Sequence, residues 1–301
     1  MKLRMGTRGS ALALAQSGIV AAAVARLEPG LEVETVRIQT SGDRFSLQSP
    51  QQARGLAQGT KGLFVKEIEE ALADGRVDFA VHSAKDLPAQ LMDGLLIAAY
   101  PRREDPRDAF IGRDGASWSG LGPGARLGTS SLRRQVQLLA ARPALAMVPM
   151  RGNVDTRLRK LQEGLCDGLV LARAGLLRLG LSHIPHEPLP EEALLPAPGQ
   201  GALALEARGD RREVVSLLGR LDHAGTRLEV ELERVVVQEL GGGCSVPLAA
   251  RAEAGAGQAR LSVFFSEPDG SRAVRLAGLC RDLAAREAFA RDLAAQVRAR
   301  R

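Results

Sequence analysis

Short apolar runs alternate with helical patterns over roughly the first two hundred residues, and this alternation restricts the possible folds more than any other feature. The apolar runs predict strands at residues 3–5, 33–38, 79–82, 95–99, 126–128, 146–150, 168–172 and 202–206. Apolar residues at helical spacing predict helices at residues 10–27, 64–74, 131–141, 154–163 and 173–179. Strands that alternate with helices are typical of α/β layers with largely parallel sheets.

Two proline-dense stretches, residues 101–108 and 187–201, are candidate domain joins. Beyond them, a helical pattern at 210–240, strand-like runs at 246–252 and 261–265, and a terminal helix at 282–297 predict a separate small α+β domain. Residues 41–61 are rich in Gly, Gln, Ser and Pro and have no apolar period. We expect a long loop there, of the length that is usually functional or disordered in a compact domain.

The composition is that of a folded globular protein, with 45% hydrophobic and 25% charged residues. A chain of 301 residues is too long for one compact core, so two or three domains are expected. Of its 41 basic residues all but five are arginine, against 35 acidic residues. The planar guanidinium binds carboxylates and phosphates through paired hydrogen bonds, although genome composition alone could also produce an arginine-rich chain.

The amino-terminal stretch combines basic residues with an apolar run at 11–25, as a secretory signal does. Gln16, Ser17 and Gly18 interrupt that run, and no apolar run reaches the roughly 18 residues of a membrane span. We therefore expect a strand followed by an amphipathic helix here, and no membrane segment.

The three cysteines, Cys166, Cys244 and Cys280, are widely spaced and form no Cys-x-x-Cys pair. Neither a disulfide framework nor a zinc site fits, so we expect no metal and a cytoplasmic protein with reduced thiols. Cys166 and Cys280 lie in apolar patterns that indicate structural thiols. Cys244 follows three glycines, which leave its thiol sterically open and make it a candidate nucleophile. The alternative is a buried inert thiol, and no histidine motif supplies a partner.

Three predicted strand-to-helix turns, at residues 7–10, 128–131 and 151–153, combine capping side chains with arginine. Arg133, Arg134 and Arg157 follow in the first turns of the second and third helices. Free N–H groups at helix starts attract anions, and the carboxyl ends of strands in open α/β sheets bind ligands. These turns predict a site for an anion with several negative groups. The alternative is that each cap only completes its helix and the arginines are solvated.

Lys85 and Asp86 directly follow the predicted strand at 79–82. An ammonium and a carboxylate side by side at the end of a strand could hold a substrate between opposite charges, and the carboxylate could stabilise a developing cation or move a proton. The alternative is a surface ion pair worth less than about 1 kcal/mol.

Eight motifs occur in a recognisable order along the chain. They are TRGS at 7–10, GLFVKE at 62–67, VHSAKD at 81–86, REDPRDAF at 103–110, GTSSLRRQ at 128–135, RGNV at 151–154 followed by Thr156 and Arg157, PGQG at 198–201 and GGC at 242–244. From about residue 3 to 250 the sequence resembles the porphobilinogen deaminase (hydroxymethylbilane synthase) family. The resemblance is weaker in the last fifty residues.

The resemblance implies two α/β domains like those of periplasmic binding proteins and a small carboxyl-terminal α+β domain. The implied boundaries are 1–99 with 198–217, 100–197 and 218–301. It also implies a transferase that condenses four porphobilinogen molecules head to tail, releases ammonia and hydrolyses off hydroxymethylbilane. A dipyrromethane cofactor would serve as primer, held by a thioether at Cys244.

By position, Asp86 matches the family's catalytic aspartate, Gln200 a supporting residue, and Lys61 and Phe64 residues of a loop at the site. The residues that match positions binding cofactor and substrate carboxylates are Arg8, Ser10, Lys85, Thr129, Ser131, Arg133, Arg134, Arg151, Arg157 and Arg178. Another loop lysine common in the family, four residues before Lys61, is replaced here by Ala57. This departure leaves the loop's share of carboxylate binding open.

Two other functions are compatible with parts of the sequence. A non-catalytic anion-binding protein of the periplasmic type would share the fold and the arginines, but would not need the Cys244 loop. A nucleic-acid binder would suit the basic pI near 9.8, but an aromatic content of 3% leaves little for base stacking. We therefore expect porphobilinogen as the partner, no nucleic acid or membrane partner, and a monomer.

Overall fold

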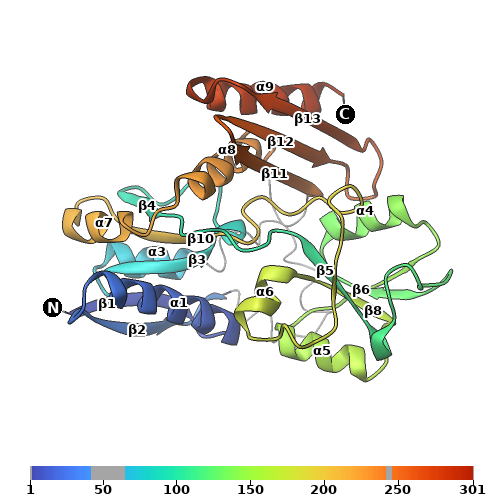
Figure 1. The fold of residues 1–301 in the computed structure, drawn as a ribbon, viewed down its shortest axis with the longest axis horizontal. Coiled ribbons are helices and arrows are strands. Elements are labelled where there is room, and N and C mark those ends of the chain that lie inside the picture. Colours follow the sequence, from blue (N-terminus) through green and yellow to red (C-terminus); the bar gives the residue numbers. More distant parts are fainter. Residues whose placement is uncertain (1, 42–64, 242–245, 301) are drawn as a thin grey trace.

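A computed structural model describes residues 2–41, 65–241 and 246–300 of the chain. Within these residues, two five-stranded sheets and one three-stranded sheet form three separate groups of strands (Figure 1). Helices pack on each sheet, so the mixed α/β class expected from the alternation of strands and helices is confirmed.

The first sheet has the order β2-β1-β3-β10-β4. Its strands are β1 (Lys2–Arg8), β2 (Glu32–Ile38), β3 (Phe79–Ser83), β4 (Leu95–Ala99) and β10 (Leu203–Arg208), and its helices are α1 (Ala11–Leu27), α3 (Lys66–Ala73) and α7 (Arg212–Gly219). The two faces follow from the alternation of side chains along a strand. Phe79 and Val81 pack in one apolar cluster with residues of α1 and α7, whereas Ala80 packs in another with residues of α3. Strand β10 runs antiparallel to β3, with Ala204 opposite His82.

The second sheet has the order β7-β6-β8-β5-β9. Its strands are β5 (Asp108–Gly112), β6 (Arg126–Gly128), β7 (Ala146–Val148), β8 (Gly168–Ala172) and β9 (Glu187–Pro188), and its helices are α4 (Leu132–Ala141), α5 (Val154–Gln162) and α6 (Arg173–Arg178). Adjacent side chains of β8 again point to opposite faces of the sheet. Leu169 and Leu171 pack with residues of α5 and α6, and Val170 packs with Leu138 of α4.

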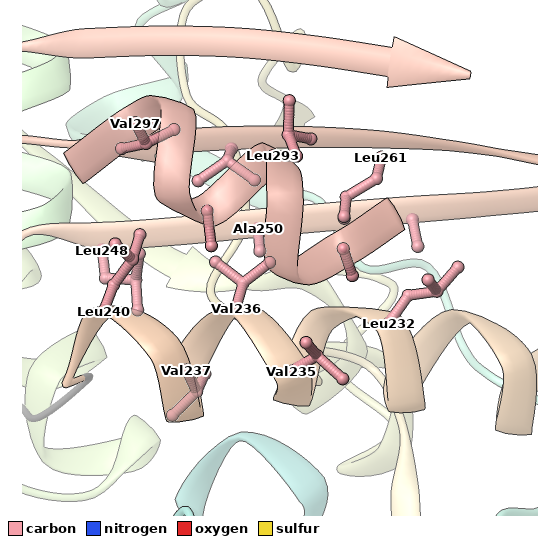
Figure 2. Close-up of a cluster of buried hydrophobic side chains, with 14 of the residues drawn as sticks. Leu232, Val235, Val236, Val237, Leu240, Leu248, Ala250, Leu261, Leu293 and Val297 are labelled. Atoms are coloured by element: carbon pink, nitrogen blue, oxygen red, sulfur yellow. The ribbon is translucent and has the colours of Figure 1, made fainter. Parts of the chain in front are cut away.

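The third sheet is an antiparallel meander of β11 (Leu248–Gly255), β12 (Gln258–Phe265) and β13 (Val274–Cys280). Helices α8 (Ala224–Leu240) and α9 (Arg286–Ala299) cover one face of it, with Val236, Leu261 and Leu293 among the buried side chains between them (Figure 2). Phe264 on the opposite face packs with Val136, so this sheet also contacts α4, a helix of the second group.

Each strand and helix predicted in the first two hundred residues is found within a few residues of its expected place. Strand β5 was not predicted, because it begins at the end of a proline-dense stretch and is buried on both faces, so it has no alternating pattern. Strand β13 was also missed.

The helical pattern at 210–240 does not form one continuous helix. It is interrupted between α7, which ends at Gly219, and α8, which begins at Ala224. There the ring of His223 accepts a hydrogen bond from the N–H of Thr226 at 3.1 Å and caps the second helix. The loop expected at 41–61 lies almost wholly outside the described residues.

Candidate active site

A cavity of about 360 Å³ lies where the three sheets meet. The chain passes from the first sheet to the second over residues 100–107, the first crossing, and returns to the first sheet over residues 189–202, the second crossing. The cavity brings together the turn after β3, the start of α4, the first turn of α5, the second crossing and the start of the carboxyl-terminal sheet. The lining residues are Lys85, Asp86, Ser130, Ser131, Arg133, Arg134, Arg157, Ala197, Pro198, Gln200, Val246 and Leu248. Seven of the residues expected at the site are therefore gathered around one space.

Lys85 and Asp86 lie in a single turn of 3₁₀-helix, Ala84–Asp86, at the end of β3. The N–H of Ala84 donates to the carbonyl of Ala202 at 3.0 Å, which ties the turn to the second chain crossing. Gly199 of that crossing has φ of +74°, and a Cβ there would lie 2.9 Å from the backbone of Ala84 and Lys85. The close approach therefore requires glycine, and it holds the turn that carries the two charged side chains.

Arg133 and Arg134 are buried and share one counterion, Asp108 at the start of β5. Arg133 Nη2 donates to Asp108 Oδ2 at 2.7 Å, and Arg134 donates to Oδ1 through Nε and Nη2 at 3.0 and 2.7 Å. Burial opposes ionisation of Asp108, but the two guanidiniums outweigh it and lower the pKa of its carboxyl. Two cations against one anion leave positive charge at the start of α4.

The remaining cations of the cavity, Lys85 and Arg157, form no salt bridge with a carboxylate of the described residues. Burial, together with Arg134, lowers the pKa of Arg157 to about 10, and its Nε donates to the carbonyl of Gly152 at 2.7 Å. Burial also lowers the pKa of Lys85, although Asp86 opposes this effect. Desolvated cations that cluster in this way favour a ligand that brings carboxylates.

Asp86 also faces a smaller cavity of about 60 Å³, which is lined by Arg8, Ser10 and Gln16 of the first strand and helix. The hydroxyl of Ser10 accepts from the N–H of Ala13 and caps α1, as the TRGS turn predicts. Asp86 thus lies between two groups of expected anion-binding residues, which come from the first and second sheets.

Other expected residues have different surroundings. Thr129 is buried, and its hydroxyl accepts from the N–H of Ser131 at 3.2 Å, so it supports the start of α4. Arg178 Nη2 donates to the carbonyl of Gly201, and burial lowers the pKa of Arg178 to about 10. Arg151 is exposed and does not line either cavity. Lys61, Phe64 and Cys244 lie outside the described residues.

Sequence reasoning missed Asp108, Ser130 and Gln16 at the site. Asp108 lies in the quoted REDPRDAF motif, but only its proline and charge density were interpreted, as a domain join. An acidic residue at the start of a buried strand was the available signal, because a carboxylate in that position needs a cationic partner. Val246 and Leu248 line the cavity two and four residues after Cys244.

A buried carboxylate on α8 joins the chain crossings to the carboxyl-terminal part. Glu233 accepts from Arg103 Nη1 and Nη2 at 2.8 and 3.0 Å, from the N–H of Gly199 at 2.6 Å and from the N–H of Ala252 at 2.8 Å. Arg103 also donates through Nε to the carbonyl of Gln200 at 2.9 Å. The second crossing is therefore held by Glu233 of α8 and by Arg103 of the first crossing.

The part of the chain that the structure describes holds neither a candidate metal cluster nor a candidate membrane-spanning helix. No group of three or more His, Cys, Asp or Glu side chains in it could hold a metal ion. No helix in it is long and apolar enough to cross a membrane.

The fold and the cavity together define a class: a protein with two α/β sheets, a small α+β part and a cationic cavity for a small molecule that carries carboxylates. Residues 3–216 match the family model described as porphobilinogen deaminase, dipyromethane cofactor binding domain, and residues 227–299 match its carboxyl-terminal domain. The chain belongs to the porphobilinogen deaminase family.

Curated relatives from the same family align with most of this chain. The porphobilinogen deaminase of Geobacter sulfurreducens is 47% identical over 275 residues, 91% of this chain and 84% of the relative. The one of Sorangium cellulosum is 49% identical over 271 residues, 90% of this chain and 89% of the relative. Among solved structures, the methionine binding protein MetQ has a TM-score of 0.45 at 17% identity, over 73% of this chain and 89% of that chain.

Proposed function

We propose that this protein is the transferase that condenses four porphobilinogen molecules head to tail, releases ammonia and hydrolyses off hydroxymethylbilane in tetrapyrrole biosynthesis. The observation that carries the proposal is the placement of Asp86 among Lys85, Arg133, Arg134 and Arg157 in one cavity. Each porphobilinogen brings an acetate and a propionate, so a growing chain of pyrroles accumulates carboxylates that such cations would bind.

The residues present fit a dipyrromethane cofactor. Its side-chain carboxylates match the desolvated cations Lys85 and Arg157 and the partly neutralised pair Arg133 and Arg134. The hydroxyl side chains of Ser130 and Ser131 line the same cavity and can donate to carboxylate oxygens. When bound, the cofactor supplies the pyrrole carbon to which the first substrate unit is joined.

Asp86 has the role of the catalytic carboxylate in this proposal. Loss of ammonia from porphobilinogen leaves a methylene-pyrrole cation, which the surrounding guanidiniums and ammonium would destabilise. A carboxylate fixed in the 3₁₀ turn offsets that repulsion, stabilises the cation and accepts a hydrogen bond from a pyrrole N–H. Its position between the larger cavity and the pocket of Arg8 and Ser10 lets it act at the junction of two ligand groups.

Cofactor attachment through the thiol of Cys244 is part of the same proposal. Val246 and Leu248, close to it in sequence, line the cavity, which supports an attachment point within reach of the cations. Arg8 and Ser10 are proposed to bind the incoming substrate. Thr129 and Arg178 are proposed to act mainly through the elements that they hold. Arg151 is proposed to bind carboxylates, and Lys61 and Phe64 to belong to a loop at the site.

The proposed division of the chain is 1–99 with 198–217, 100–197 and 218–301. It is supported by β10, which follows the strands of the second sheet in sequence but lies between β3 and β4 in the first. We also propose a cytoplasmic monomer that acts on porphobilinogen alone, without a nucleic-acid or membrane partner.

The experiment that tests the proposed function replaces Asp86 by alanine. Asp86→Ala should abolish consumption of porphobilinogen, with a fall of at least about a hundredfold in kcat, while the purified protein still carries the cofactor on Cys244. Asp93→Ala, which removes an exposed carboxylate, is the matched control and should retain full activity. An Asp86→Ala protein with normal turnover would contradict the role of this carboxylate.

A further inference from the structure

Gln200 lies in the second chain crossing, between two glycines that have positive φ, Gly199 at +74° and Gly201 at +84°. A Cβ on Gly201 would lie 2.4 Å from the carbonyl oxygen of Glu104, so the turn is packed closely against the first crossing. Both backbone groups of Gln200 form hydrogen bonds. Its N–H donates to the carbonyl of Ala197, and its carbonyl accepts from Arg103 Nε. The backbone that carries this side chain is therefore rigidly held.

The orientation of the Gln200 carboxamide is determined by its partners. Its Nε2 donates to the carbonyl of Pro106 at 2.7 Å and to Asp108 Oδ1 at 3.1 Å. Both partners are acceptors, because the two arginines that flank Asp108 keep its carboxyl ionised. A flipped amide would place its oxygen against two acceptors, so Oε1 must be directed away from them.

This leaves a buried acceptor at the wall of the cavity. Gln200 is 1% exposed and lines the cavity, and Oε1 has no hydrogen-bond partner within residues 2–41, 65–241 and 246–300. Buried polar groups in folded proteins nearly always find a partner, because an unpaired acceptor loses its bond to water without replacement. The neighbouring Gln137 illustrates the usual case, since its oxygen accepts from the N–H of Leu195 and its nitrogen donates to two carbonyls.

The missing partner must be a donor, and the position of the oxygen selects its kind. The cations of the cavity match carboxylates, whereas the buried carboxamide oxygen of Gln200, a lining residue of the same cavity, is a neutral acceptor. A pyrrole ring carries one N–H, which donates and cannot accept, as the indole N–H does. We propose that Gln200 Oε1 accepts a hydrogen bond from a pyrrole N–H of a ring bound in the cavity, and so sets the orientation of that ring. This inference rests on the proposed function.

The test uses apoprotein and porphobilinogen labelled with ¹⁵N in the pyrrole ring. Apoprotein is incubated with the labelled substrate, cofactor uptake is followed by intact mass, and the pyrrole N–H resonances of the loaded protein are recorded. Gln200→Met removes the acceptor at similar volume, and Gln137→Met is the matched control, because it removes three buried protein hydrogen bonds but no free acceptor.

We expect one pyrrole N–H resonance to move upfield in Gln200→Met and none to move in Gln137→Met. Uptake of the cofactor by Gln200→Met should be slower by about tenfold, as for loss of one hydrogen bond to a buried partner. Unchanged pyrrole resonances in Gln200→Met would overturn the inference and indicate that water satisfies Oε1. If the wild-type protein takes up no pyrrole, the proposed function itself fails.

A second measurement keeps the inference testable if Gln200→Met does not fold. In wild-type protein labelled with ¹³C, the side-chain carbonyl resonance of Gln200 should move downfield between the apo and loaded forms. The resonance of Gln137 should stay in place, because its oxygen is already bonded in the protein. Equal resonances of Gln200 in both forms would overturn the inference without any variant.

Discussion

Asp108 explains how two adjacent arginines can be buried beside a cavity. Its side chain is fully buried and bonds both guanidiniums and the carboxamide of Gln200. Two isolated guanidiniums would be costly to bury at this position, whereas a shared carboxylate lowers that cost and leaves net positive charge toward the ligand. A single residue therefore sets both the stability and the polarity of this wall.

A second buried group of ionisable residues lies on the α3 side of the first sheet. His82 Nε2 is 2.9 Å from Glu206 Oε2 across the β3–β10 pairing, and Glu69 of α3 is buried near both. Burial, with a smaller contribution from Glu206, raises the pKa of Glu69 above its ordinary value, even though the N–H of Met92 donates to it. The folded protein therefore binds the proton of Glu69 more tightly than the unfolded chain does.

This shift makes Glu69 destabilising at neutral pH. A carboxyl with a raised pKa carries no penalty below its unfolded pKa near 4.5, and stability falls as pH rises through the folded pKa. Glu69→Gln should therefore raise Tm at pH 7, and the gain should vanish near pH 4. A gain of about 1 kcal/mol in the free energy of unfolding would raise Tm by roughly 2–4 °C. Thermal melts at both pH values measure this. The exposed Glu70→Gln is the control, and an equal Tm for Glu69→Gln and wild type at pH 7 would contradict the argument.

Individual site residues could be predicted from the sequence only in part. Asp86, Lys85 and the arginines at the start of α4 were accessible because each lies in a motif at the end of a strand. Their partners were not accessible, since the contact between Asp108 and Arg133 joins residues from different strands and helices. Arg151 was accessible as a motif residue, but its exposure outside the cavity depends on side-chain packing that no local pattern encodes.

At the level of secondary-structure elements, the turn at Gly199–Gly201 positions the turn at Ala84–Asp86. The Gly199–Gly201 turn contacts the backbone of Ala84 and Lys85, and the N–H of Ala84 bonds to Ala202. The turn that carries Lys85 and Asp86 is therefore aligned by a segment more than a hundred residues away in sequence. Periodicity located β3 and β10, because both are short apolar runs, but it carried no information on their pairing.

Gly199→Ala tests this contact. The added Cβ would meet two backbone atoms at 2.9 Å, so the turn that carries Asp86 must shift, and a displacement near 1 Å can reduce turnover by about a hundredfold. We expect kcat to fall by about ten- to a hundredfold, with a smaller change in KM. Steady-state kinetics on protein loaded with cofactor measure both constants.

Gly180→Ala is the matched control for the backbone conformation. Gly180 also has positive φ, at +70°, but no atom lies within 4 Å of the position of its Cβ. Both variants carry the same left-handed strain of about 1–3 kcal/mol, and only Gly199→Ala displaces the turn that carries Asp86. Similar kcat values for the two variants would show that the contact with Ala84 and Lys85 does not align the site.

At the scale of the whole molecule, Glu233 connects the carboxyl-terminal part to both chain crossings. It accepts hydrogen bonds from Arg103 in the first crossing, Gly199 in the second and Ala252 in β11. The composition and the proline-dense stretches predicted several units and their approximate joins. They could not predict this connection, because Glu233 lies within an ordinary helical pattern and its partners are distant in sequence.

Arg103→Leu should weaken this connection strongly. Removal of Arg103 leaves the buried carboxylate of Glu233 without its nearest counter-charge, with Arg251 more distant at 3.9 Å. Loss of one partner from a buried ion pair costs about 3–5 kcal/mol. Urea unfolding followed by Trp118 fluorescence and by far-UV circular dichroism should then give lower midpoints that no longer coincide. Arg220→Leu, which breaks the half-exposed pair with Glu28, is the control and should cost less than about 1 kcal/mol. Equal losses in the two variants would contradict the role assigned to Glu233.

The proposed function requires a dipyrromethane cofactor on the thiol of Cys244. The most direct measurement is the intact mass of the purified protein, followed by peptide mapping around Cys244. We expect an added mass equal to two linked pyrroles on the peptide that contains this cysteine. A thiol that stays unmodified after incubation with porphobilinogen would contradict the proposed function.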